Sequence, residues 1–197
     1  MAKRRLLVTT LLLLGLAGLT GCAQKPQATI RLEPYSPDAA VLQKSGTIRL
    51  AGVIDARREK RVVGRIVRNG RTITTLYNDQ PLAKWFADAL TRALEVEGCR
   101  VVTEKSDNPK VATVRVEIDS IQATLDRGRL TSENLTAEAR VTLHIRQGSA
   151  KVTKRVSLSQ SRWVPPLAGE DTLRDYLQET LDGLVEEVRE NIDIYRF

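Results

Sequence analysis

The sequence predicts an α+β fold, an antiparallel β-sheet meander with two helices packed on one face, after a signal peptide and a flexible tether. Residues 111–125 and 135–145 alternate apolar and polar side chains, which is typical of strands with one buried face. Residues 78–98 and 170–192 instead carry apolar side chains at helical spacing. The expected order is a strand and hairpin, a helix, four strands and a last helix, which gives an antiparallel sheet with both helices on one face. Because several of the strands are long, we expect the sheet to be a curved meander.

The N-terminal 21 residues have the layout of an export signal. Three cations, Lys3, Arg4 and Arg5, precede an apolar run from Leu6 to Leu16. A helix that spans a bilayer needs about 20 apolar residues, and this run is shorter. A charged start followed by a short apolar core is typical of a signal peptide that is removed from the mature protein.

The signal ends in Leu19-Thr20-Gly21-Cys22, which resembles the bacterial lipobox. The resemblance implies cleavage before Cys22 and attachment of fatty acids such as palmitate to it. Several acyl chains hold a protein stably on a membrane without spanning it. The alternative is a signal peptide with an incidental cysteine near its end. The next residue, Ala23, implies by the same resemblance a lipid anchor in the outer membrane, with the protein facing the periplasm.

The chain divides into a signal peptide (1–21), a lipidated N-terminus and linker (22–46) and a periplasmic α+β domain (47–197). The linker contains three prolines and no sustained periodicity, so we expect a semi-extended tether. The alternative is that Arg31, Tyr35 and Leu42 dock part of it on the domain. Removal of the signal lowers the formal net charge from +7 to +4, because the signal holds three cations and no acid. With Cys22 acylated, Cys99 has no partner for an intramolecular disulfide and is expected to be a buried apolar residue.

The first half of the domain is predicted to contain a strand and then a hairpin. Apolar side chains alternate through residues 47–54. Two short strands then flank Asn69-Gly70, and this dipeptide is a strong signal for a two-residue hairpin turn.

A helix is predicted after the hairpin, within residues 78–98. Asn78 or Asp79 is expected to cap its start, and Pro81 is tolerated in the first turn. Gly98 is placed to end the helix.

Long strands are expected to fill most of the second half. Apolar residues of the strand at 111–125 change parity after Ser120, which predicts a β-bulge at Asp119 or Ser120. Pro165-Pro166 is expected to end the sheet, and the last helix to begin near Glu170.

The residues that enzymes use are not grouped in this sequence. The single histidine, His144, lies between two apolar residues and is expected on the exposed face of its strand. One such histidine makes neither a catalytic dyad nor a zinc site. Phosphate-binding glycine-rich loops and nucleophile-elbow motifs are also missing. We therefore expect no enzyme activity, no catalytic residue, no metal and no cofactor, and export excludes nucleic acid as a partner.

Residues 55–71 are unusually rich in cations. The segment contains seven basic residues and two acidic residues. Dense positive charge in a loop and hairpin attracts anions. We predict that these cations bind an anionic envelope component or a partner protein: Arg57, Arg58, Lys60, Arg61, Arg65, Arg68 and Arg71. The alternative is a solvated hairpin whose arginines pair with acids elsewhere.

These features together resemble the YajG-like family of bacterial outer-membrane lipoproteins. The resemblance rests on the lipobox, on the strand end Val53–Arg57 (VIDAR), on Gly64, and on the helix 82–101 (LAKWFADALTRALEVEGCRV). It covers most of the mature chain and implies an anchored protein with neither cofactor nor catalytic residues. The Asp-x-Arg of this family is here Asp55-Ala56-Arg57, and we expect an ion pair between Asp55 and Arg57 that shapes the turn.

The sequence thus favours a non-enzymatic, lipid-anchored periplasmic lipoprotein of the outer membrane that binds another envelope component. The alternative is an accessory lipoprotein subunit of an envelope transport or cell-wall assembly machine. Both place the membrane contact at Cys22.

Overall fold

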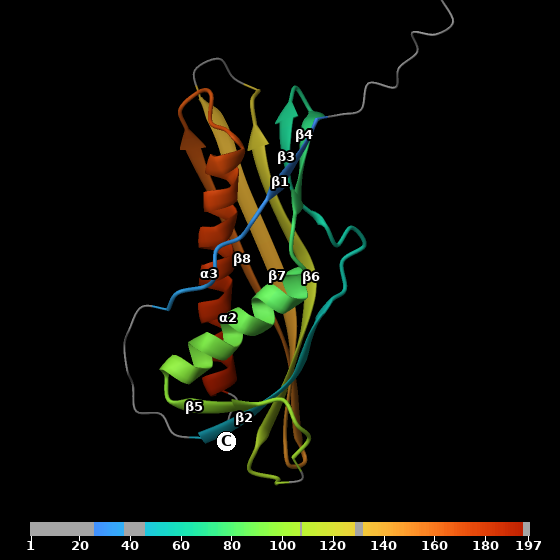
Figure 1. Cartoon of the computed structure of the whole chain (residues 1–197), viewed down its shortest axis with the longest axis vertical. Coiled ribbons are helices and arrows are strands. Elements are labelled where there is room, and N and C mark those ends of the chain that lie inside the picture. The colour runs from blue at the N-terminus through green and yellow to red at the C-terminus, as the bar shows by residue number, and fades with distance from the viewer. Residues whose placement is uncertain (1–25, 38–45, 107, 129–131, 195–197) are drawn as a thin grey trace, which may run out of the picture.

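In the computed structural model, residues 26–37, 46–106, 108–128 and 132–194 are described, and they form one eight-stranded sheet with two helices (Figure 1). The strands are β1 (Gln27–Ile30), β2 (Gly46–Asp55), β3 (Val62–Arg68), β4 (Arg71–Asn78), β5 (Cys99–Val102), β6 (Ala112–Asp126), β7 (Glu133–Gln147) and β8 (Ala150–Val164). The helices are α2 (Leu82–Val96) and α3 (Glu170–Ile194).

The mixed α+β composition and the two helices are as predicted, but the antiparallel meander describes only part of the sheet. The β3–β4, β6–β7 and β7–β8 pairs are antiparallel, whereas β1–β4, β2–β5, β2–β6 and β3–β6 are parallel. The prediction of an antiparallel meander was wrong for the parallel pairs, because side chains alternate between the two faces in every strand, whatever the direction of its neighbour.

β6 is the central strand, and its partner changes halfway along one edge. β2 pairs with the first half, from Ala112 to Ile118, and β3 pairs with the second half, from Ala123 to Asp126. The register of β6 against β7 shifts between Ile118 and Ser120, so the predicted bulge is confirmed. The bulge therefore lies where β2 ends and β3 has not yet begun.

Both helices pack on the apolar face of this sheet. In Figure 1, α3 runs along β7 and β8, and α2 crosses the C-terminal half of α3. Six α3 side chains illustrate the buried stripe, each at most 1% exposed: Leu173, Leu177, Leu181, Leu184, Val188 and Ile192. The expected start of this helix at Glu170 is confirmed.

The predicted hairpin turn at Asn69-Gly70 and the predicted end of α2 at Gly98 are confirmed, but the predicted start of α2 is not. Asn69 (φ 49°) and Gly70 (φ 72°) both have the left-handed backbone that a type I′ hairpin turn requires. Gly98 (φ 86°) ends α2 and donates its N–H to the carbonyl of Glu95 at 2.9 Å. The expected side-chain cap at Asn78 or Asp79 was wrong, because Pro81 occupies the N-cap position.

The predicted linker extends less far than expected. Residues 27–30 form β1, which pairs in parallel with β4, and Leu32 and Tyr35 are 2% and 5% exposed. The boundary at residue 46 was therefore misplaced, because proline content hides a short strand whose partner lies about 50 residues away. Residues 1–25, which include the predicted signal peptide and Cys22, lie outside the described part of the chain.

Candidate functional site

The cation-rich segment begins with a loop of six residues, 56–61, that joins β2 to β3. We call it the Arg57 loop. Its first residue, Ala56, donates its N–H to the carbonyl of Ile118 at 3.0 Å, beside the bulge of β6. The loop thus projects from the sheet at the point where β6 exchanges one partner strand for the other.

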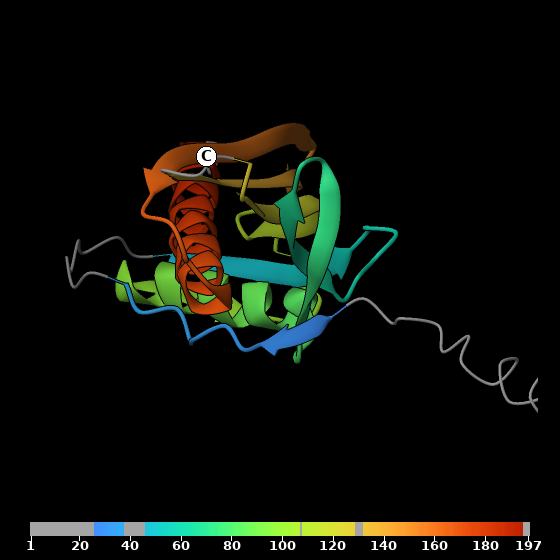
Figure 2. The same ribbon diagram turned by 90° about the horizontal axis from the view of Figure 1, so that it is seen from above.

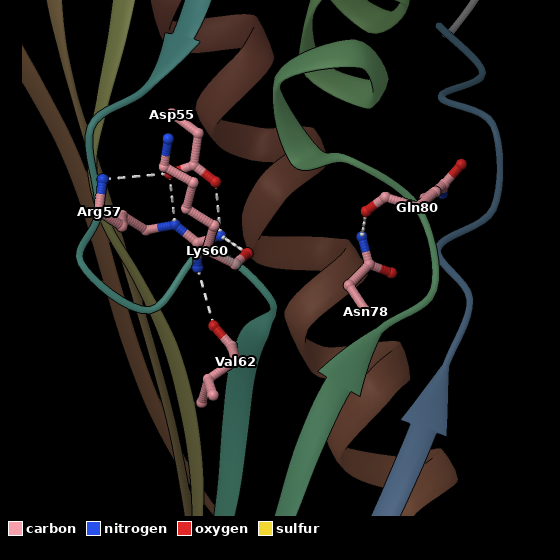
Figure 3. A network of polar contacts seen from close by, with 6 residues as sticks. All are labelled: Asp55, Arg57, Lys60, Val62, Asn78 and Gln80. Atoms are coloured by element: carbon pink, nitrogen blue, oxygen red, sulfur yellow. Dashed lines mark hydrogen bonds and ion pairs between the residues drawn. The ribbon is translucent and has the colours of Figure 1, made fainter.

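The Arg57 side chain folds back into the protein and pairs with Asp55 (Figure 3). Its Nε lies 2.9 Å from Oδ1 of Asp55, and its Nη2 lies 2.8 Å from Oδ2, so the pair is bidentate. The two side chains are 6% and 9% exposed. The ion pair expected between these residues is present, and its burial makes Arg57 unavailable to a ligand at the surface.

Arg57 also holds the backbone of the loop that contains it. Its guanidinium donates to the carbonyl of Lys60 and, at 2.9 Å, to the carbonyl of Val62 (Figure 3). The carbonyl of Glu59 accepts the N–H of Val62 at 3.2 Å, and the carbonyl of Arg61 accepts the N–H of Asn78 at 2.8 Å. Four consecutive carbonyls, from residue 59 to residue 62, therefore have partners, and the loop has a fixed shape.

The seven predicted cations do not form one surface. Arg57 is internal, and Arg65 pairs with Glu59 at 2.8 Å. Three others are exposed on the Arg57 loop, and we call them the loop cations: Arg58, Lys60 and Arg61. The remaining two, Arg68 and Arg71, flank the β3–β4 turn and are called the turn cations.

The loop cations and the turn cations are separated by β3. Its seven residues span about 20 Å at 3.3 Å per residue. Within the described residues, none of the five has an ion-pair partner. The segment therefore offers two distinct exposed positive groups, each available to an external anion.

Two hollows flank the Arg57 loop. One, of about 430 Å³, lies beside the bulge and is lined by Arg58, Arg65 and Asp119 among others. Asp119 accepts the hydroxyl of Thr142 at 2.7 Å, and Arg65 is paired with Glu59, which also lines this space. Arg58 is the lining cation that is exposed and has no ion-pair partner among the described residues. The other, of about 510 Å³, is lined by Val53, Ile54 and the start of α2, with Lys60 and Arg61 at its border.

Among the described residues outside the cation-rich segment, titratable side chains do not assemble into a recognisable catalytic group. His144 lies on the exposed face of β7, with its Nδ1 3.3 Å from the hydroxyl of Thr153 and its Nε2 3.7 Å from a carboxylate oxygen of Glu117. Across the described residues, no three His, Cys, Asp or Glu side chains are placed to share a metal ion. Burial raises the pKa of Asp182 on α3.

Within the described part of the chain, neither helix has the length and apolar character needed to cross a bilayer. The one predicted membrane attachment, Cys22, precedes the first described residue by four positions.

A family model described as an uncharacterized lipoprotein matches residues 35–195. The chain belongs to this lipoprotein family. The match includes β2, the Arg57 loop, the hairpin and both helices, so the predicted relationship to bacterial lipoproteins is confirmed. The family description assigns no catalytic activity and no partner. A comparison with curated proteins found no match.

Several solved structures are similar to this lipoprotein at low sequence identity. A protein from Xanthomonas campestris is 13% identical, with a TM-score of 0.56, over 82% of this chain and 92% of its own. An uncharacterized protein is 11% identical, with a TM-score of 0.50, over 85% of this chain and 99% of its own. A minor lipoprotein from Acinetobacter baumannii is 17% identical, with a TM-score of 0.42, over 74% and 95% of the two chains. At such identities the first two show the fold alone.

Sequence reasoning missed two exposed apolar residues at one end of the sheet. Trp163 at the end of β8 is 59% exposed, and Leu167, just after Pro165-Pro166, is 92% exposed. The two prolines marked the end of the strand, but no pattern in the sequence distinguishes an apolar residue held in solvent from one in the core.

Proposed function

We propose that this lipoprotein is a non-enzymatic binding module of the outer membrane, anchored through acylated Cys22, facing the periplasm, and binding an anionic envelope component through its loop cations. The observation that carries the proposal is the fixed shape of the Arg57 loop. Four backbone carbonyls and one buried ion pair hold it, while Arg58, Lys60 and Arg61 remain exposed.

A fixed loop favours binding because little conformational entropy is lost when a ligand binds to it. A charged group on a mobile loop loses conformational freedom when it binds, and this loss reduces affinity. Here Arg57 supplies the order in the absence of a ligand. The loop cations thus present a preorganised group of positive charge to phosphate or carboxylate groups, with two hollows beside it.

Charge reversal tests this role. The lipidated protein in detergent is mixed with isolated sacculi or with lipopolysaccharide, and the sedimented fraction is measured. We expect the triple variant Arg58→Glu, Lys60→Glu, Arg61→Glu to weaken binding about tenfold or more, a loss of about 1.4 kcal/mol.

A matched control reverses three exposed cations on β8, Lys151, Lys154 and Arg155. This variant has the same net charge as the loop variant, so we expect near-normal binding from it. Equal losses in the two variants would show that net charge, and not the loop, determines binding.

The alternative, an accessory subunit of an envelope machine, is favoured by a different observation. β8 pairs with β7 along all 15 of its residues, and no described strand pairs with its other edge. An unpaired edge of this length is suited to strand addition by a partner protein. A photoreactive residue at Ser157 that crosslinks one envelope protein in stoichiometric yield, while one at Lys60 crosslinks none, would favour this alternative.

A further inference from the structure

The chain enters the domain at a defined place. The carbonyl of Pro26 accepts the N–H of Thr75 on β4 at 3.2 Å, and β1 begins at the next residue. Cys22 precedes Pro26 by four residues, and four residues reach at most about 14 Å when fully extended. An acyl anchor at Cys22 therefore holds Thr75 close to the bilayer surface.

One end of the molecule lies near this entry point. It is formed by the β3–β4 turn and by the β8–α3 connection, residues 165–169, and we call it the tether end (Figures 1 and 2). Thr75 lies four residues from Arg71 in the turn, or about 13 Å along β4. The opposite end lies a further 15-residue strand away, about 46 Å along β6, beyond the reach of the anchor.

The tether end carries a leucine in an unusual state. Leu167 has a left-handed backbone (φ 74°), which is strained for a residue with a branched side chain, and it is 92% exposed. Strained backbone persists where surrounding structure imposes it, and it is concentrated at functional sites.

A partly buried ion pair holds the backbone around Leu167. The N–H of Leu167 donates to Oε1 of Glu133 at 3.3 Å, and Nη2 of Arg127 donates to the carbonyl of Ala168. Arg127 and Glu133 face each other at 3.4 Å between Nε and Oε1, and the Glu133 side chain is 7% exposed. The backbone is therefore held at the N–H of Leu167 and at the carbonyl of Ala168, and the Leu167 side chain lies in solvent.

The groups around Leu167 match a bilayer surface. Trp163, 59% exposed, lies at the end of β8, and tryptophan is enriched at membrane–water interfaces. The turn cations, Arg68 and Arg71, are exposed at the same end and have no ion-pair partner among the described residues. Basic side chains beside a membrane are attracted to anionic lipid headgroups.

We propose that the tether end is a second membrane contact, in which Leu167 and Trp163 enter the headgroup region and Arg68 and Arg71 bind phospholipid phosphates. The inference rests on the proposed acylation of Cys22. This contact fixes the orientation of the domain. α3 and the long strands extend from the bilayer surface into the periplasm, and the Arg57 loop lies above the membrane surface.

Spin labels on the lipidated protein test the orientation. One label replaces Leu167, and the matched label replaces Ala150, which is exposed at the other end of β8. Both proteins carry Cys99→Ala, so that one thiol reacts. In vesicles of phosphatidylethanolamine and phosphatidylglycerol, we expect a several-fold higher ratio of oxygen to nickel-chelate accessibility at position 167 than at position 150.

Charge variants test the headgroup contact. Arg68→Gln and Arg71→Gln are added to the protein labelled at position 167. We expect the ratio of molecules whose label lies in the membrane to molecules whose label lies in water to fall about 25-fold, fivefold for each arginine. The same change at Lys151 and Arg155 should leave the ratio unaltered.

Three results would overturn the proposal, and they differ from one another. If the protein lacks acyl chains by mass and does not sediment with vesicles, the anchor and the orientation both fail. If it is acylated and sediments, yet positions 167 and 150 are equally water-exposed, the orientation alone fails. If position 167 leaves water in native envelopes but not in lipid vesicles, the occupant of the tether end is a protein and not the bilayer.

Discussion

Arg57 and Asp55 stabilise the Arg57 loop and do not bind a ligand directly. Both side chains are less than 10% exposed, and the guanidinium also donates to the carbonyls of Lys60 and Val62. Such a pair leaves an uncompensated buried charge when one partner is removed, and this is strongly destabilising.

We therefore expect Arg57→Ala to lower the free energy of unfolding by about 3–5 kcal/mol, measured by urea denaturation. Arg58→Ala, one position along and exposed, is the control and should change it by less than about 0.5 kcal/mol. A loss of equal size in the two variants would mean that the ion pair does not hold the loop.

At the residue scale, the sequence predicted the pairing of Asp55 with Arg57 through the family resemblance, and the structure contains it. The availability of the cations was harder to predict. Arg57 and Arg58 are adjacent in the sequence, yet one is internal and the other exposed. Arg57 is internal because its guanidinium donates to the carbonyls of Lys60 and Val62. The loop places these carbonyls beside Arg57, and no local sequence pattern predicts that placement.

Among the elements, β1 changes the account of the N-terminal segment. It occupies the edge of the sheet next to β4, and Leu32, two residues beyond it, is 2% exposed. The chain from residue 27 to residue 35 is therefore part of the folded domain.

Leu32→Ala should accordingly lower the free energy of unfolding by about 2–5 kcal/mol, the range for buried leucines. Ser36→Ala, exposed four residues later, should have little effect. Chemical denaturation of the two variants gives the comparison, and a Leu32 variant as stable as the wild type would restore the segment to the role of a tether.

α3 contains a carboxylate that burial disfavours. The pKa of Asp182 is raised above its ordinary value by desolvation, against an opposing hydrogen bond from Gln178 at 2.8 Å. The folded protein thus holds this proton more tightly than the unfolded chain does. The resulting destabilisation is present above the raised pKa and disappears as the pH falls below 3.8, the ordinary pKa.

Asp182→Asn removes this effect and retains an acceptor for Gln178. We expect the variant to be more stable than the wild type at neutral pH and the difference to vanish in acid, measured as unfolding free energies across a pH series. Glu187→Gln, an exposed change on the same helix, should give no such trend. A stability difference that is constant with pH would show that desolvation of Asp182 is not its cause.

Strand direction is the feature of the elements that the sequence did not predict. β6, β7 and β8 follow one another through short connections and are antiparallel, as expected. β2 and β3 instead lie end to end on one edge of β6, and both are parallel to it. Apolar and polar side chains alternate along β2 and β3 whether these strands are parallel or antiparallel to β6. Only the long-range pairing of the strands therefore distinguishes a parallel from an antiparallel arrangement.

On the scale of the whole molecule, the two positive groups have different places relative to the lipid anchor. The turn cations lie at the tether end with Leu167 and Trp163, and the loop cations lie about 20 Å away along β3. The proposed membrane contact at the tether end is therefore separate from the proposed contact of the loop cations with a second envelope component. The sequence placed all seven cations in one segment, and the rigid hairpin divides them.

This separation depends on acylation of Cys22, and the intact mass of the protein extracted from native membranes tests it most directly. The account predicts a chain that begins at Cys22 and carries a diacylglyceryl thioether and an acylated amine. A chain that begins at Met1 and retains an unmodified Cys22 thiol would contradict it.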